Sequence, residues 1–200
     1  MAKRIDSYLP VYQQHLREYL LKISPNTPLN ELEELIQCFT IEKYAKNTIL
    51  LPAGVNNNTV YFIGKGLVRI FYEKDGKEIT NWLLEENSMF APTYSILSGD
   101  TNYFTYQLLE NSHLLKIDYA VWESYYSKYH AIERLGRRLI SVYYGAFMRK
   151  TVDVLFLSAE ERYQLFVKEH QSLLNRVPLR HIASYLGITQ ETLSRIRAKY

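Results

Sequence analysis

The stretch LRHIASYLGITQETLSRIRAKY, which runs from Leu179 to Tyr200, decides our interpretation of the fold. Its pattern predicts two short helices with a turn at Gly187 between them. A small residue, Ala183, stands where the helices would cross, and the apolar Leu193 and Ile196 would anchor the second helix. This spacing is typical of a helix-turn-helix. The alternative is a helical hairpin that only completes the fold.

The second predicted helix, residues 189–199, carries a polar face with the chemistry to touch base edges. Glutamate can accept a hydrogen bond from cytosine, and arginine can donate two to guanine. The basic surplus lies in the same place, because the segment from Val177 onward accounts for the whole net charge of +3. The residues that we expect to bind DNA are Thr189, Gln190, Glu191, Ser194, Arg195, Arg197, Lys199 and Arg180.

Upstream of these helices, residues 40–118 show the period of two that is typical of strands. Short β-rich runs alternate with turn residues, and Asp75-Gly76 has the composition of a hairpin turn. Repeated short strands of this kind predict an antiparallel sandwich or barrel. Before this region, apolar residues from Ile5 to Ile23 recur at steps of three and four, which predicts an N-terminal helix.

A long helix is predicted after the strands, in the stretch IERLGRRLISVYYGAFMRK (132–150). Its apolar residues repeat at steps of three and four, which favours pairing with a second copy of the chain, although a helix lying on the barrel is the alternative. The predicted dimer seam consists of Ile132, Leu135, Leu139, Val142 and Ala146. Ser158 and Glu161 then have the spacing of a capping box that opens a further helix.

Composition excludes several classes of protein. The hydrophobic fraction of 47% is typical of a globular chain, and the single cysteine, Cys38, excludes an intrachain disulfide. Charged residues in the first 25 positions argue against a secretory signal, and no long apolar stretch predicts a membrane span, so we expect a cytoplasmic protein. A cupin-like metal enzyme is a weaker alternative, because only His113 lies among the predicted strands. We therefore expect no enzyme activity, metal or cofactor.

The order of these parts resembles the Crp/Fnr family of bacterial transcription regulators. The likeness is carried by LPAG (51–54) with VYFIGKGLVRIFYEKDGKEI (60–79), and by GITQETLSRI (187–196). It implies an α+β fold: an antiparallel jelly-roll barrel of the cyclic-nucleotide-binding type, a long dimerisation helix and a winged helix-turn-helix. The corresponding ranges are 1–118, 119–152 and 153–200.

The resemblance also implies where an effector would bind, and here the sequence departs from the family. Asn102 stands at the position of the arginine that holds the phosphate of a cyclic nucleotide in the family. Ala91 and Pro92 stand at the positions of the family's glycine and glutamate, the pair that assists this arginine. Tyr103 adjoins this position, and Val142 and Tyr143 replace the hydroxyl residues that would meet the purine. Arg69 and Lys65 are the cations that could substitute, but strand lysines and arginines are more often solvated. We expect no response to cyclic AMP.

The function implied by the resemblance is sequence-specific DNA binding by a homodimer on a two-fold symmetric operator. RNA polymerase and an unknown small molecule are candidate further partners. Asp153 matches the family's interdomain hinge, and it would come just after the long helix. The alternative function is a barrel-type module that binds a small molecule and signals through protein contacts.

Overall fold

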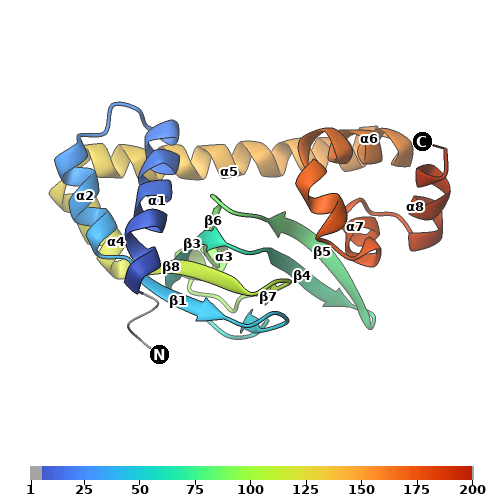
Figure 1. Ribbon diagram of the computed structural model, residues 1–200, viewed down its shortest axis with the longest axis horizontal. Coiled ribbons are helices and arrows are strands. Elements are labelled where there is room, and N and C mark those ends of the chain that lie inside the picture. Colours follow the sequence, from blue (N-terminus) through green and yellow to red (C-terminus); the bar gives the residue numbers. More distant parts are fainter. Residues whose placement is uncertain (1–5, 200) are drawn as a thin grey trace.

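The computed structural model describes residues 6–199, so Ile5 and Tyr200 lie outside the described residues. A long helix, α5 (His130–Phe156), runs the length of the molecule above a β-barrel (Figure 1). Helices α1 (Leu9–Ile23), α2 (Leu29–Gln37) and α4 (Tyr119–Lys128) lie at one end of α5. Helices α6 (Ala159–Glu169), α7 (Leu179–Tyr185) and α8 (Gln190–Arg197) lie at the other end.

The barrel consists of two four-stranded antiparallel sheets, with strand orders β1-β8-β3-β6 and β2-β7-β4-β5. Their strands are β1 (Thr40–Tyr44), β2 (Ile49–Leu51), β3 (Thr59–Lys65), β4 (Val68–Lys74), β5 (Lys77–Leu84), β6 (Met89–Phe90), β7 (Thr105–Leu108) and β8 (Ser112–Asp118). Asp75 and Gly76 join β4 to β5 with φ angles of 53° and 70°, which confirms the predicted hairpin turn. The antiparallel β architecture expected from the sequence is therefore confirmed.

Helices cover the outer face of the first sheet. They are α1 (Leu9–Ile23), α2 (Leu29–Gln37), α4 (Tyr119–Lys128) and the first half of α5, while the short α3 (Thr93–Ser98) follows β6. Side chains alternate along β3 and β8, so Phe62 and Leu115 pack against these helices while Ile63 and Leu114 point into the barrel. The helix predicted near the N-terminus is confirmed as α1.

The start of α5 belongs to this helical layer, and this corrects the predicted dimer seam. Ile132, Leu135 and Leu139 are 0%, 0% and 6% exposed, and they pack with α1 and α2 in the chain's own core. They are not available to a second copy, so the alternative of a helix lying on the barrel applies to this half of α5. Of the other two seam residues, Val142 is exposed and Ala146 is half-buried.

The C-terminal helices form a second unit at the far end of α5. They are α6 (Ala159–Glu169), the 3-10 helix η3 (Gln171–Asn175), α7 (Leu179–Tyr185) and α8 (Gln190–Arg197). Ser158 and Glu161 make the predicted capping box at the start of α6. No strand follows Asp118 in residues 6–199, so the prediction of a winged motif is wrong for the part of the chain that the structure describes.

The position of Asp153 also differs from the expectation. α5 ends at Phe156 rather than near 152, so Asp153 lies inside the last turn of the helix. Its carbonyl oxygen accepts a hydrogen bond of 3.0 Å from the backbone N–H of Leu157, the residue that caps the end of the helix.

Candidate nucleic-acid interface

α7 and α8 form a compact pair whose turn and cap are set by local sequence. Gly187 has a φ of +67°, a left-handed conformation that glycine adopts at little cost. Thr189 then starts α8, because its hydroxyl accepts a 3.2 Å hydrogen bond from the backbone N–H of Thr192. Leu193 and Ile196 are buried against α6 and α7, which fixes the orientation of α8.

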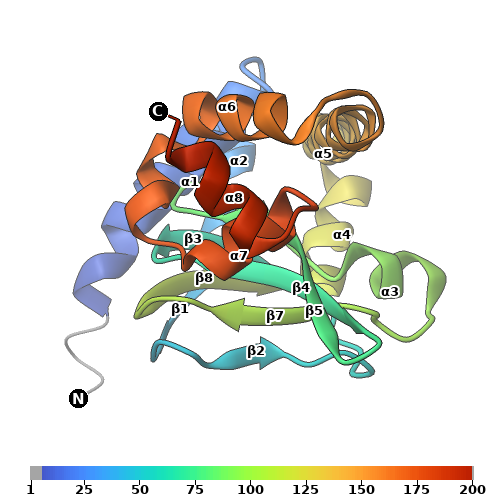
Figure 2. The same cartoon turned by 90° about the vertical axis from the view of Figure 1, so that its right-hand side faces the viewer.

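The opposite face of α8 is open to solvent at the end of the molecule (Figure 2). Gln190, Glu191, Ser194 and Arg195 are exposed there, as predicted from their spacing. The backbone N–H of Glu191 and the hydroxyl of Thr189 hold the pKa of the Glu191 carboxyl below its usual range, so this side chain is an acceptor at neutral pH. The face thus offers a carboxylate acceptor and a guanidinium donor four residues apart.

Three of the four remaining predicted DNA-binding residues have contacts of their own. Arg197 is exposed, but Lys199 is ion-paired at 2.8 Å with Glu160 of α6. Arg180 lies on α7, where its Nε approaches Nε2 of His181 at 3.5 Å. The hydroxyl of Thr189 serves as the helix cap. Gln190, Glu191, Ser194 and Arg195 are therefore the exposed polar side chains that share one face of α8.

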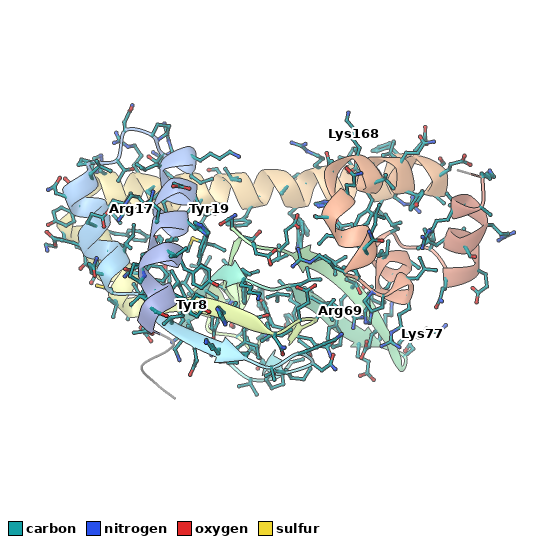
Figure 3. All side chains as sticks on the ribbon, in the orientation of Figure 1. Tyr8, Arg17, Tyr19, Arg69, Lys77 and Lys168 are labelled. Atoms are coloured by element: carbon teal, nitrogen blue, oxygen red, sulfur yellow. The ribbon has the colours of Figure 1, made fainter. Side chains whose placement is uncertain are left out.

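The outer face of the second sheet contacts α7 beside a buried arginine. Arg69 of β4 is 1% exposed, and it donates to Thr80 at 2.9 Å and to Glu78 at 2.6 Å (Figure 3). Ser184 of α7 accepts from the backbone N–H of Thr80 at 2.8 Å. The expectation that Arg69 is solvated is wrong, and its position under α7 also leaves it unavailable to a phosphate inside the barrel. Lys65 is exposed.

A second arginine, Arg176, links the segment before α7 to the loops of the barrel. Its guanidinium makes two hydrogen bonds to each of Glu86 and Glu110, at 2.8 to 2.9 Å. Glu85 adds a third carboxylate at 3.4 Å. These bonds raise the pKa of Arg176. Paired bonds to carboxylates are directional, so this cluster fixes the C-terminal unit against the barrel.

Aromatic rings fill the interior of the barrel where a cyclic nucleotide would be expected. The rings of Tyr61 and Phe90 stack at 5.0 Å, and those of Phe90 and Tyr106 at 5.8 Å. Burial raises the pKa of Tyr106, which fits an apolar surrounding. These three rings belong to the apolar core inside the barrel.

The residues at the predicted effector positions have partners of their own. The Asn102 side chain is buried, and its amide donates to the carbonyl of Phe104 at 2.6 Å. Ala91 and Pro92 lead into α3, whereas Tyr103 is exposed with its ring 5.1 Å from that of Tyr94. The Tyr143 hydroxyl donates to the carbonyl of Met89 at 2.8 Å. The structure does not bring these residues together into a charged pocket.

Two further findings concern the residues that the structure describes. No group of three or more His, Cys, Asp or Glu side chains within 6–199 is arranged to hold a metal ion. In the same range, no helix combines the length and the apolar character needed to cross a bilayer.

The barrel and its helices define a cyclic-nucleotide-binding type of fold, and residues 41–129 match the family model of the cyclic nucleotide-binding domain. No curated protein matches the sequence. Among solved structures, the chain is similar to FixK2 from Bradyrhizobium japonicum, with a TM-score of 0.71 and 18% identity over 80% of this chain and 83% of that one. It is also similar to CooA from Carboxydothermus hydrogenoformans, as a mutant, with a TM-score of 0.63 and 20% identity over 84% and 78%.

The catabolite activator protein of Thermus thermophilus is a third similar structure, with a TM-score of 0.57 and 18% identity over 90% of this chain and 85% of that one. At these identities, the likeness shows a shared fold. It extends over most of each chain.

Proposed function

We propose that the protein is a homodimeric, sequence-specific DNA-binding regulator of transcription of the Crp/Fnr type. One observation carries the proposal: Glu191 and Arg195 lie side by side on the exposed face of α8, while its opposite face is buried. A helix held in this way can enter a major groove and present an acceptor and a double donor to base edges.

A dimer would follow from the second half of α5. Its exposed apolar side chains Ile140, Tyr144, Phe147 and Leu155, which we call the α5 stripe, are 52%, 64%, 50% and 70% exposed. They share one side of the helix, because their spacing is close to whole turns. Pairing two copies along the α5 stripe would present two α8 helices, as required by half-sites about one helical turn of DNA apart.

We further propose that cyclic AMP is not the effector. The support is the aromatic packing inside the barrel and the hydrogen bonds that already satisfy Asn102. The division into residues 1–118, 119–152 and 153–200, the hinge role of Asp153 and a contact with RNA polymerase remain proposals of the same kind.

Selection of binding sites from random duplex DNA tests the function. We expect enrichment of a two-fold symmetric sequence, and a binding constant that falls steeply with salt because bound phosphates release counterions. A protein that signals only through apolar protein contacts would enrich no sequence. The competing metal enzyme would instead retain a stoichiometric metal ion after purification.

A further inference from the structure

A hollow lies between the long helix and the C-terminal unit, outside the barrel. Its volume is about 530 Å³, and α5, α6, α7 and β5 all contribute to its wall. Volumes of 300–1,000 Å³ are usual for small-molecule sites. Val142, which the sequence places among the effector residues, lines this hollow rather than the barrel.

Lys150 is the unusual group in the wall. Its ammonium lies 3.9 Å from the centre of the Tyr185 ring and 5.2 Å from that of Trp82, and it donates a hydrogen bond to the carbonyl of Asn81. No ion pair joins it to a carboxylate of residues 6–199. Burial lowers its pKa to about 7. The half-buried ammonium has no counter-ion, so an anion beside it would favour its charged form and could accept a charge-assisted hydrogen bond.

The rest of the wall limits the kind of anion. Trp82, Phe166 and Tyr185 supply aromatic surface, which suits a flat apolar ring. Asp153 and Glu169 also line the hollow, and their charges disfavour a ligand with several negative groups.

The other cations in the wall differ in availability. The Arg162 guanidinium is occupied, since it donates to the carbonyls of Leu186 at 2.9 Å and Leu157 at 2.6 Å. Arg149 is exposed at the rim of the hollow, next in the chain to Lys150. The wall therefore offers a single negative group one half-buried cation, Lys150, and one exposed cation, Arg149.

We propose that this hollow binds a small aromatic monocarboxylate, with its carboxylate at Lys150 and its ring among Trp82, Phe166 and Tyr185. Such a ligand would contact α5 and also α6 and α7, the helices that pack against α8. Binding of the ligand does not depend on DNA binding. The ligand proposal and the DNA-binding proposal can therefore fail independently of each other.

The test is calorimetric titration of the full chain, without DNA, using benzoate and indole-3-acetate as probes and indole-3-acetamide as the uncharged analogue. We expect saturable binding of at least one acid below millimolar concentration, and binding of indole-3-acetamide at least 10-fold weaker than that of indole-3-acetate. Lys150→Met should weaken acid binding at least 10-fold. Lys168→Met is the matched control and should bind like the parent, because Lys168 of α6 does not line the hollow and its exposed side chain points outward from the helix (Figure 3).

A second variant guards against a folding effect at Lys150. Gly145 lines the hollow and has no atom within 4 Å of the place where a side chain would begin, so Gly145→Leu should fill the hollow and abolish binding while the thermal transition is preserved. The proposal is overturned if neither acid binds at 5 mM, if Lys150→Met binds as tightly as the parent, or if Gly145→Leu leaves binding unchanged.

Discussion

Phe147→Asp should convert the protein from a dimer into a folded monomer. Phe147 is 50% exposed on the α5 stripe, and the burial of a whole phenylalanine side chain removes about 200 Å² from water. Pairing would therefore cover about 100 Å² of this ring in each copy, which contributes about 2.5 kcal/mol per copy at 25 cal/mol/Å². The loss from both copies should weaken dimerisation by roughly 10³-fold or more, before the cost of burying two carboxylates is added.

Sedimentation equilibrium over a concentration series measures this change. Leu29→Asp is the matched control, because Leu29 is an exposed leucine on α2, away from the stripe, and this variant should stay dimeric. Leu139→Asp should behave differently from both, since Leu139 lies in the chain's own core and a buried carboxylate there should unfold the protein. A parent protein that is monomeric at tens of micromolar, or a Phe147→Asp variant that remains a dimer, would refute the reasoning.

Three further predictions test other parts of the account. Cyclic AMP should show no saturable heat below about 1 mM, because Asn102 offers no positive partner, and micromolar affinity would contradict the packed barrel. Arg176→Met should lower the free energy of unfolding in urea by about 2 kcal/mol, since the carboxylates of Glu86 and Glu110 lose their donor, and an unchanged midpoint would contradict the clamp. Burial, with Arg69 and Arg180 nearby, lowers the pKa of His181 to about 4, so the folded state resists protonation and stability should fall by about 2 kcal/mol from pH 7 to pH 5. The His181→Gln variant should lose that part of the pH dependence, and an identical slope would contradict the assignment.

Local features of the fold were predictable from the sequence because neighbouring residues decide them. The Asp75-Gly76 turn and the capping box of Ser158 and Glu161 need only their own side chains and backbone. β6 and α3 were not predicted, because two strand residues and a six-residue helix are too short to show a period. Their conformation depends on neighbours in the folded structure.

Features that depend on distant contacts were predicted less well. The repeat in α5 shows that the helix has an apolar face, but it does not show what covers that face. α1 and α2 cover Leu135 and Leu139, whereas the α5 stripe, one residue further around the helix, stays exposed. Arg69 has the appearance of a solvated strand residue until α7, more than 100 residues later, packs over it. The exposed face of α8 was predictable because its buried anchors lie within the same helix.

The hollow beside Lys150 gives no signal in the sequence. Its wall is drawn from four elements, and the ring partners Trp82 and Tyr185 stand about 100 residues apart in the chain. Nothing in the pattern around position 150 distinguishes this lysine from the exposed Arg149 beside it. The packing of α6 and α7 against α5 makes Lys150 half-buried and leaves Arg149 exposed.

The central claim, that α8 reads DNA sequence, is tested most directly by titrating Glu191→Ala and Arg195→Ala against a selected site and a scrambled duplex at one salt concentration. Loss of two bonds to guanine should cost Arg195→Ala about 1–3 kcal/mol on the selected site and relax base preference at that position. Glu191→Ala should keep or gain non-specific affinity while its discrimination falls, because the carboxylate is repelled by phosphates. Lys168→Ala, on the exposed side of α6, should leave the ratio of specific to non-specific affinity unchanged. If both α8 variants keep the parent's ratio of specific to non-specific affinity, α8 does not read DNA sequence.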